Sequence, residues 1–194
     1  MTQLALQPHF AIDAAGWCLQ ARRVPSPHHN ERAAPDDISL LVVHGISLPP
    51  GEFGGPFIDD LFMGRLDPDA HPYFAAIHQL RVSAHCLIRR DGELVQYVPF
   101  GARAWHAGVS SWQGREACND FSIGIELEGT DETLYTEAQY RALASLTRAI
   151  AGRYPAITHE KIVGHCDIAP GRKTDPGASF QWDHLRQLLN LESK

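Results

Sequence analysis

Residues 137–154 carry the clearest secondary-structure signal in this 194-residue chain, and they constrain its fold most. The stripe of side chains at helical spacing consists of Tyr140, Leu143, Leu146 or Thr147, and Ile150. Thr136 can cap the start, and Gln139 stands where a capping box places its second polar residue. Pro155 ends the pattern because proline cannot continue a helix. We therefore predict one long amphipathic helix over these residues.

Two other segments have the character of β-strands. Residues 38–43 form a short apolar run rich in branched side chains, which indicates a buried strand that ends at His44. Residues 121–127 place apolar side chains at every second position, beginning with Phe121, and this is the periodicity of a strand. Glu126 falls between those apolar positions, so it is predicted to point to the opposite face.

A further strand signal has the form of a hairpin. Residues 84–89 and 93–98 are both strand-like, and the dipeptide Asp91-Gly92 between them favours a tight primed turn. Shorter elements are expected elsewhere: helices at 57–63, 72–80 and 180–190, and a strand at 161–164 that leads into His165. Together these segments predict an α+β (mixed α/β) fold, with a single central mixed β-sheet flanked by helices.

Composition bounds the class of protein. The length and the hydrophobic fraction of 44% suit one domain over residues 1–194, with residues 1–15 as an irregular extension. A net charge of −6 gives no reason to expect nucleic acid or an anionic membrane as a partner. The start of the chain has no basic and apolar signal-peptide pattern, and its four cysteines show no paired spacing. We expect a cytoplasmic monomer with reduced thiols.

Three residues at the ends of predicted elements are candidate metal ligands. His44 follows one strand, His165 follows another, and Asp175 lies in a polar loop rich in glycine and proline. Imidazole nitrogen and carboxylate oxygen are good zinc ligands, and three of them leave an open position for water. Taken singly, each residue has an ordinary interpretation, as a core or surface histidine or as a turn aspartate. Spacing alone leaves both interpretations open.

Two charged residues are candidates for the chemistry itself. Glu126 is an acid within an apolar strand, and burial would raise the pKa of its carboxyl towards that of a general base. A solvated face would make it a surface residue instead, and Glu128 has the same parity. Lys173 could stabilise an oxyanion near a metal, or be an ordinary loop lysine. Trp105 and His106 could line a cleft or serve a structural role.

Several motifs together resemble a known family. They cover residues 41–44, 46–55, 81–92, 103–108, 119–129 and 164–177. In these stretches the chain resembles the AmpD-type 1,6-anhydro-N-acetylmuramoyl-L-alanine amidases, members of the zinc amidase superfamily that also includes the peptidoglycan recognition proteins. The resemblance extends from about Gly16 to about Asp183, nearly the whole chain.

The resemblance implies a set of roles. His44, His165 and Asp175 correspond to the ligands of one Zn²⁺ per chain, in a cleft at the strand ends. Glu126 corresponds to the catalytic acid and base, and Lys173 to the lysine that assists it. The positions where the family contacts its substrate are Arg81, Trp105 and Arg172. The implied activity cuts the amide between the lactyl group of (1,6-anhydro)-N-acetylmuramic acid and L-alanine, during peptidoglycan recycling, with an anhydromuropeptide as the small-molecule substrate.

One position departs from the family pattern, and three rival interpretations remain. Gly45 follows the first ligand where the resemblance leads us to expect asparagine, which would remove a side-chain contact to the substrate. His85 matches a Ser-x-His strand motif that we interpret as structural or as a support for the ligands. The rivals are an exported enzyme that acts on intact cell wall, a module that binds muropeptide without cutting it, and a purely structural zinc.

Overall fold

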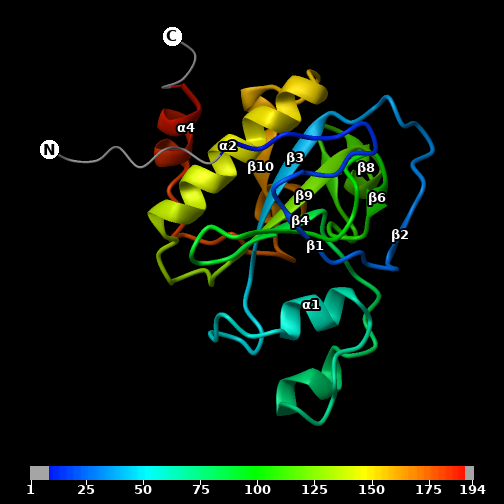
Figure 1. Ribbon diagram of the computed structural model, residues 1–194, viewed down its shortest axis with the longest axis vertical. Helices are drawn as coiled ribbons and strands as arrows, with labels where there is room; N and C mark the ends of the chain where they lie inside the picture. Colours follow the sequence, from blue (N-terminus) through cyan, green and yellow to red (C-terminus); the bar gives the residue numbers. More distant parts are fainter. Residues whose placement is uncertain (1–8, 191–194) are drawn as a thin grey trace, which may run out of the picture.

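A central six-stranded β-sheet organises the protein in the computed structural model, which describes residues 9–190 (Figure 1). In spatial order the strands are β1 (Arg22–Arg23), β5 (Leu94–Gln96), β4 (Cys86–Ile88), β9 (Ser122–Glu128), β3 (Leu40–Ile46) and β10 (Ile162–Gly164). β4 and β5 are antiparallel, and the other neighbouring pairs are parallel. The sheet is therefore mixed, and its two longest strands, β3 and β9, lie side by side in its interior.

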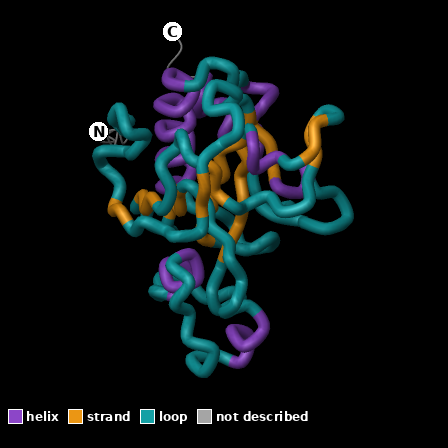
Figure 2. The backbone as a smooth tube through the Cα atoms, turned by 90° about the vertical axis from the view of Figure 1, so that its right-hand side faces the viewer, coloured by secondary structure: helices purple, strands orange, loops and turns teal. Residues whose placement is uncertain are grey.

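Helices flank this sheet. α2 (Glu137–Arg153) and α4 (Trp182–Asn190) lie together on one side of it (Figure 1). α1 (Phe57–Phe62) and the 3-10 helix η1 (Pro72–Ala76) lie beyond one end of the sheet (Figure 2). The remaining short elements are β2 (His29–Asn30), β6 (Arg103–Ala104), β7 (Ser111–Trp112), β8 (Arg115–Glu116), η2 (Cys118–Asp120), η3 (His159–Lys161) and α3 (His165–Ile168). The arrangement confirms the predicted α+β class.

The two faces of the sheet bury different side chains, and this alternation places the candidate site. Val43 of β3 and Ile125 of β9 pack in one apolar cluster with the stripe of α2. Val42 belongs to another cluster, on the opposite face. Because successive side chains of a strand point to opposite faces, His44 and Glu126 lie on the face away from α2. His44 and Glu126 therefore share the face of the sheet that α2 does not cover.

The long helix is confirmed together with its cap. The Thr136 hydroxyl accepts a hydrogen bond from the Gln139 N–H at 3.2 Å, and the Gln139 side-chain oxygen accepts from the Thr136 N–H at 3.0 Å. A cap of this kind contributes about 0.5–2 kcal/mol to stability. The helix ends at Arg153, two residues before Pro155.

The predicted hairpin forms, but its predicted turn is wrong. β4 and β5 pair antiparallel, yet only Gly92 has a positive φ, of 90°, whereas a type I′ turn needs one at Asp91 as well. The Arg89 N–H donates to the Glu93 carbonyl at 2.9 Å, and the Gly92 N–H donates to the Arg89 carbonyl at 2.9 Å. This longer loop needs the left-handed conformation at the glycine alone, so the aspartate keeps an ordinary backbone.

Three element boundaries also differ from the prediction. β3 continues to Ile46, so His44 lies within a strand and is paired in register with Glu126 of β9. Phe121 precedes β9 and packs in the cluster of Val42, not in that of Ile125, because the preceding η2 turns the chain there. The expected helix over residues 72–80 is only the five-residue η1.

The four cysteines are free thiols, and three of them are buried. Within residues 9–190, no helix combines the length and the apolar character that a bilayer crossing requires.

Candidate metal centre and catalytic face

The structure brings the three predicted ligands together from three separate segments. His44 comes from the middle of β3, His165 is the first residue of α3 directly after β10, and Asp175 lies in the following loop. The two Nδ1 atoms are 3.0 Å apart, and Asp175 Oδ2 lies 3.3 Å from His44 Nδ1 and 3.1 Å from His165 Nδ1. Among the described residues, this is the group of histidine, cysteine and acidic side chains whose atoms converge closely enough to hold a metal ion.

The spacing of these atoms fits zinc. Zinc bonds of about 2.0–2.1 Å in a tetrahedral arrangement place neighbouring ligand atoms about 3.3 Å apart. Burial lowers the pKa of His44 to about 4, although Asp175 acts in the opposite direction, so this imidazole is neutral near pH 7. Burial by itself would raise the pKa of Asp175, but hydrogen bonds with the two histidines hold it well below its ordinary value. The donor set at neutral pH is therefore one that binds a divalent cation.

Glu126 lies beside this cluster. In the register of the sheet it is the direct partner of His44 on the neighbouring strand, so both side chains lie on the same face. Its side chain is buried, and its Oε2 atom has no hydrogen-bond partner within the described part of the chain. Burial raises the pKa of this carboxyl well above its ordinary value, Asp175 raises it further, and Lys173 lowers it. An unpartnered buried carboxyl next to a metal site is equipped to accept a proton.

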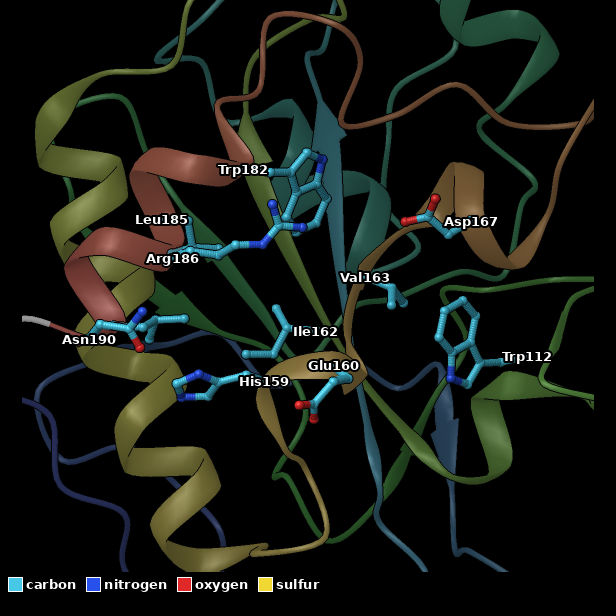
Figure 3. Close-up of a pocket in the computed structure, with 11 residues that line it drawn as sticks. Trp112, His159, Glu160, Ile162, Val163, Asp167, Trp182, Leu185, Arg186 and Asn190 are labelled. Carbon is cyan, nitrogen blue, oxygen red and sulfur yellow. The ribbon is translucent and has the colours of Figure 1, made fainter. Parts of the chain in front are cut away.

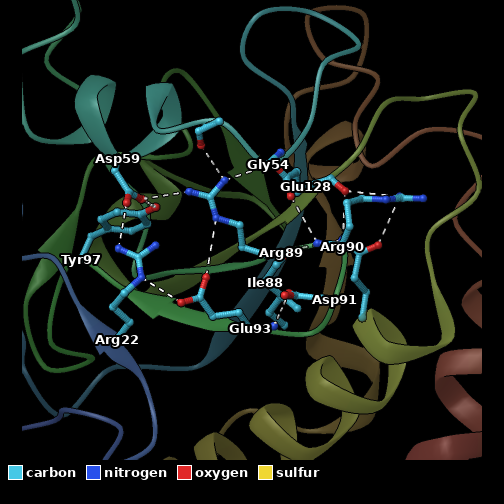
Figure 4. Close-up of polar contacts among 12 residues, drawn as sticks. Arg22, Gly54, Asp59, Ile88, Arg89, Arg90, Asp91, Glu93, Tyr97 and Glu128 are labelled. Carbon is cyan, nitrogen blue, oxygen red and sulfur yellow. Dashed lines mark hydrogen bonds and ion pairs between the residues drawn. The ribbon is translucent and has the colours of Figure 1, made fainter.

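Glu128, the competing acid of the same parity, has a different environment. Its carboxylate lies 3.2 Å from Arg89 Nη1 and accepts hydrogen bonds from the backbone N–H groups of Gly54 and Arg90. Arg89 Nη1 also donates to the Gly55 carbonyl at 2.9 Å (Figure 4). These contacts attach the loop that follows β3 to the strand β9. Glu128 is therefore a structural residue, and Glu126 is left as the candidate acid.

Two contacts that the sequence did not indicate are made to the Nε2 atoms of the histidines, on the other side of each ring from the converging Nδ1 atoms. His44 Nε2 lies 2.8 Å from His106 Nδ1, and His165 Nε2 lies 3.2 Å from the carbonyl oxygen of Ala107. His106 was visible in the sequence only as a neighbour of Trp105. A signal for it exists in Gly124, because a glycine within a buried strand marks the close approach of another group.

Two other predicted residues, Arg172 and Lys173, lie in the loop between His165 and Asp175. Lys173 is exposed, and its charge reaches both Glu126 and His44. Arg172 donates to the carbonyls of Ala107 at 2.6 Å and Val109 at 2.7 Å, so its guanidinium holds the loop next to His165.

Trp105 and Arg81 belong to other segments of the chain, between His44 and His165. The Trp105 ring stacks on His28, and its Nε1–H donates to Asn30 Oδ1 at 2.7 Å. Arg81 is exposed. No described contact joins either residue to the three converging side chains, so their contact with a substrate stays a prediction.

Gly45 can now be placed in its surroundings. A Cβ atom at this position would collide with the hydroxyl of Tyr135 as it stands, so an asparagine would require the tyrosine ring to move. The Tyr135 hydroxyl donates to the carbonyl of Pro176 at 2.9 Å, directly after Asp175. The effect of Gly45 on substrate contacts stays a prediction.

Two surface grooves differ in their relation to the centre. One, of about 620 Å³, is lined by Gly108, Val109, Ala169 and Arg172, which flank the segments of Ala107 and His165. Another, of about 540 Å³, lies between the edge strand β10 and α4 and is lined by apolar side chains such as Trp182 and by polar ones such as Glu160 and Arg186 (Figure 3). The second groove contains none of the predicted site residues.

Comparison with known proteins identifies the family. Residues 34–178 match the family model described as N-acetylmuramoyl-L-alanine amidase. The chain belongs to this family. It is 68% identical over 178 residues to the 1,6-anhydro-N-acetylmuramyl-L-alanine amidase AmpD of Citrobacter freundii, a match that spans 92% of this chain and 95% of the relative. The AmpD of Escherichia coli K12 is 66% identical, over 92% of this chain and 97% of its own. The predicted resemblance to AmpD-type amidases is confirmed.

Solved structures agree with this assignment. A crystal structure of a selenomethionine derivative of AmpD superposes with a TM-score of 0.89 at 68% identity, over 92% of this chain and 98% of that chain. The E. coli amidase AmiD, solved with the substrate anhydro-N-acetylmuramic acid-L-Ala-D-γ-Glu-L-Lys, superposes with a TM-score of 0.58 at 33% identity. That match covers 91% of this chain and 65% of AmiD.

The buried Glu126 gives this amidase fold a pH-dependent cost in stability that can be measured. A carboxyl whose pKa is raised on folding binds its proton more tightly in the folded state. The free energy of unfolding therefore falls as the pH rises from the pKa of the unfolded state to that of the folded state. In metal-free protein, Glu126→Gln should raise the melting temperature near pH 7, by roughly 2–4 °C for each kcal/mol that the substitution adds to the free energy of unfolding. Near pH 4 the two proteins should melt alike. A thermal scan at both pH values checks this, and an equal difference at both would contradict it.

Proposed function

We propose that this protein is a zinc-dependent amidase that hydrolyses the bond between the lactyl group of 1,6-anhydro-N-acetylmuramic acid and L-alanine. The observation that carries the proposal is the buried, unpartnered carboxyl of Glu126, directly paired in register with His44 at the three-ligand centre. A module that only binds muropeptide has no use for this arrangement. A purely structural zinc is usually closed by four protein ligands, whereas three converge among residues 9–190.

The ligand roles follow from the donor atoms. His44 and His165 would bind through Nδ1, and Asp175 through Oδ2, with the fourth position open to water or substrate. When bound there, zinc lowers the pKa of a coordinated water and polarises the scissile carbonyl. The convergence of the three side chains at one point supports one such ion per protein.

The remaining steps belong to the residues of the chain. Glu126 takes a proton from the attacking water, for which its raised pKa suits it, and later gives that proton to the departing amine of L-alanine. The ammonium group of Lys173, whose charge reaches Glu126, stabilises the negative charge that develops on the carbonyl oxygen. The lactyl carbonyl gains a hydroxyl group, and the peptide leaves with a free amino group.

The substrate class rests on the relatives and on the groove beside the centre. AmpD relatives are named for the 1,6-anhydro sugar, and AmiD was solved with an anhydromuramoyl tripeptide. The groove near Gly108 and Arg172 adjoins the segments that carry the ligands. We assign Arg81, Trp105 and Arg172 to substrate contact because they correspond to the positions where the resembled family contacts its substrate. Stem peptides carry carboxylates, which the guanidinium groups of Arg81 and Arg172 would bind well. We further propose that the enzyme works as a monomer in cytoplasmic peptidoglycan recycling.

A side-by-side assay tests the substrate assignment. The zinc-loaded protein is given equal concentrations of an anhydromuropeptide, the corresponding reducing muropeptide and intact cell wall, and the released peptide is quantified by mass spectrometry. We expect the highest kcat/KM for the anhydromuropeptide. A strong preference for intact cell wall would overturn the recycling role, and no release from any of the three would overturn the amidase proposal.

A further inference from the structure

The two candidate imidazole ligands meet the same short segment on the side away from the metal. The Nε2 atom of His44 lies 2.8 Å from His106 Nδ1, and His106 Nε2 lies 3.1 Å from the hydroxyl oxygen of the fully buried Ser122. The Nε2 atom of His165 lies 3.2 Å from the carbonyl oxygen of Ala107. Adjacent residues thus contact the rear nitrogen of each ligand.

The tautomer of each ligand depends on these contacts. A carbonyl oxygen only accepts hydrogen bonds, so Ala107 requires the proton of His165 on Nε2 and leaves Nδ1 free to bind a metal. The chain from His44 through His106 to Ser122 has two self-consistent proton arrangements. In one, His44 Nε2–H donates to His106 Nδ1, and His106 Nε2–H donates to Ser122 Oγ. In the other, every donor and acceptor is reversed, and His44 Nδ1 carries the proton and cannot bind a metal.

The fold holds this segment firmly in place. The side-chain oxygen of Asn119 accepts hydrogen bonds from the backbone N–H groups of His106 at 3.1 Å and Ala107 at 2.8 Å. Arg172 donates to the same Ala107 carbonyl that faces His165. A Cβ atom at Gly124, in the middle of β9, would overlap the ring of His106. The glycine in β9 therefore leaves the space that the imidazole ring of His106 occupies.

We propose that His106 and Ala107 form a two-point support that fixes both imidazole ligands in their metal-binding tautomer. His106 is a positioning residue: it accepts the Nε2 proton of His44 and so presents His44 Nδ1 to the metal, while the Ala107 carbonyl does the same for His165. This inference rests on the proposed function, because it assumes that zinc binds the three converging side chains. Support of this kind typically changes metal affinity by about 10- to 100-fold.

Zinc affinity, measured by competition with a chromophoric chelator, tests the support directly. His106→Leu removes the acceptor for His44 Nε2–H, and we expect zinc binding to weaken by about 10- to 100-fold. His106→Asn places an amide oxygen near the former Nδ1 position, where it can accept the same proton. This variant should recover most of the lost affinity. Equal affinities for wild type and His106→Leu, or equal losses in both variants, would overturn the proposal.

Folding effects are separated from positioning by a second readout on wild-type protein. Long-range nitrogen–proton NMR spectra of the zinc-loaded protein report which ring nitrogen of each histidine carries a proton. We expect His44 and His106 to be protonated at Nε2 and unprotonated at Nδ1. A proton on His106 Nδ1 would overturn the proposal, whatever the variants do.

The same experiments distinguish this inference from the proposed function. Wild-type protein that fails to bind zinc would refute the zinc amidase assignment. Wild-type protein that binds zinc with an affinity indifferent to His106 would refute only the support. Thermal melts of the metal-free variants complete the set, because a purely packing role for His106 would lower the melting temperature without changing the affinity of the remaining folded protein.

Discussion

Replacing Glu126 by glutamine should lower kcat for amide hydrolysis by about 100- to 10,000-fold, the usual contribution of a general acid and base. The carboxyl is buried on the sheet face that carries His44, and its Oε2 atom has no partner in the described chain, so the substitution removes a proton acceptor without breaking a structural contact. Steady-state kinetics on an anhydromuropeptide measures the loss. Zinc affinity should stay close to that of the wild type, since Glu126 is not among the three converging ligands.

Glu128→Gln is the matched control for this substitution. It changes the same residue type on the same face of β9, two positions along, where the carboxylate pairs with Arg89 and holds Gly54. We expect the control to lower the melting temperature and to keep a kcat near that of the wild type. If Glu126→Gln kept full activity, or if both variants lost activity equally, Glu126 would not be the catalytic acid and base.

Replacing Asp175 by alanine should abolish both zinc binding and hydrolysis at stoichiometric zinc. The carboxylate is the anionic member of the three converging side chains, and in the proposed centre its removal takes away a ligand directly, so the loss should exceed the 10- to 100-fold typical of an outer contact. Metal content after dialysis and kcat measured on the same samples check this prediction.

Asp167→Asn provides the comparison for Asp175→Ala. Asp167 lies in the same part of the chain, but its carboxylate accepts a hydrogen bond from the Gly164 N–H at 2.7 Å and does not belong to the converging group. This control should keep its zinc. An Asp175→Ala protein that binds one zinc as tightly as the wild type would contradict the ligand assignment.

Some of this site could be predicted from local sequence and some could not. Strand periodicity placed Glu126 on the face opposite Ile125, and the structure agrees. Periodicity could not distinguish the roles of Glu126 and Glu128, because those roles depend on partners from distant segments. Arg89 and Gly54 bind the carboxylate of Glu128, whereas Glu126 Oε2 has no partner among the described residues.

The support behind the ligands shows a second limit of local patterns. His106 follows a tryptophan in a short loop, and no spacing rule connects it to a histidine 62 positions earlier in the chain. The glycine at position 124 leaves room for the ring of His106, but this can be recognised only when the ring is seen against the strand. The predicted turn type at Asp91-Gly92 was wrong for a related reason. The dipeptide is compatible with more than one loop length, and tertiary packing selects among them.

The proposed activity depends on one metal centre made by His44, His165 and Asp175, and a zinc titration of activity tests this dependence most directly. Protein stripped of metal is given increasing zinc, and the rate of peptide release from an anhydromuropeptide is followed. We expect negligible activity without zinc and a linear rise that stops at one equivalent per chain. Full activity in the stripped protein, or a rise that continues to two equivalents, would contradict the single three-ligand zinc centre.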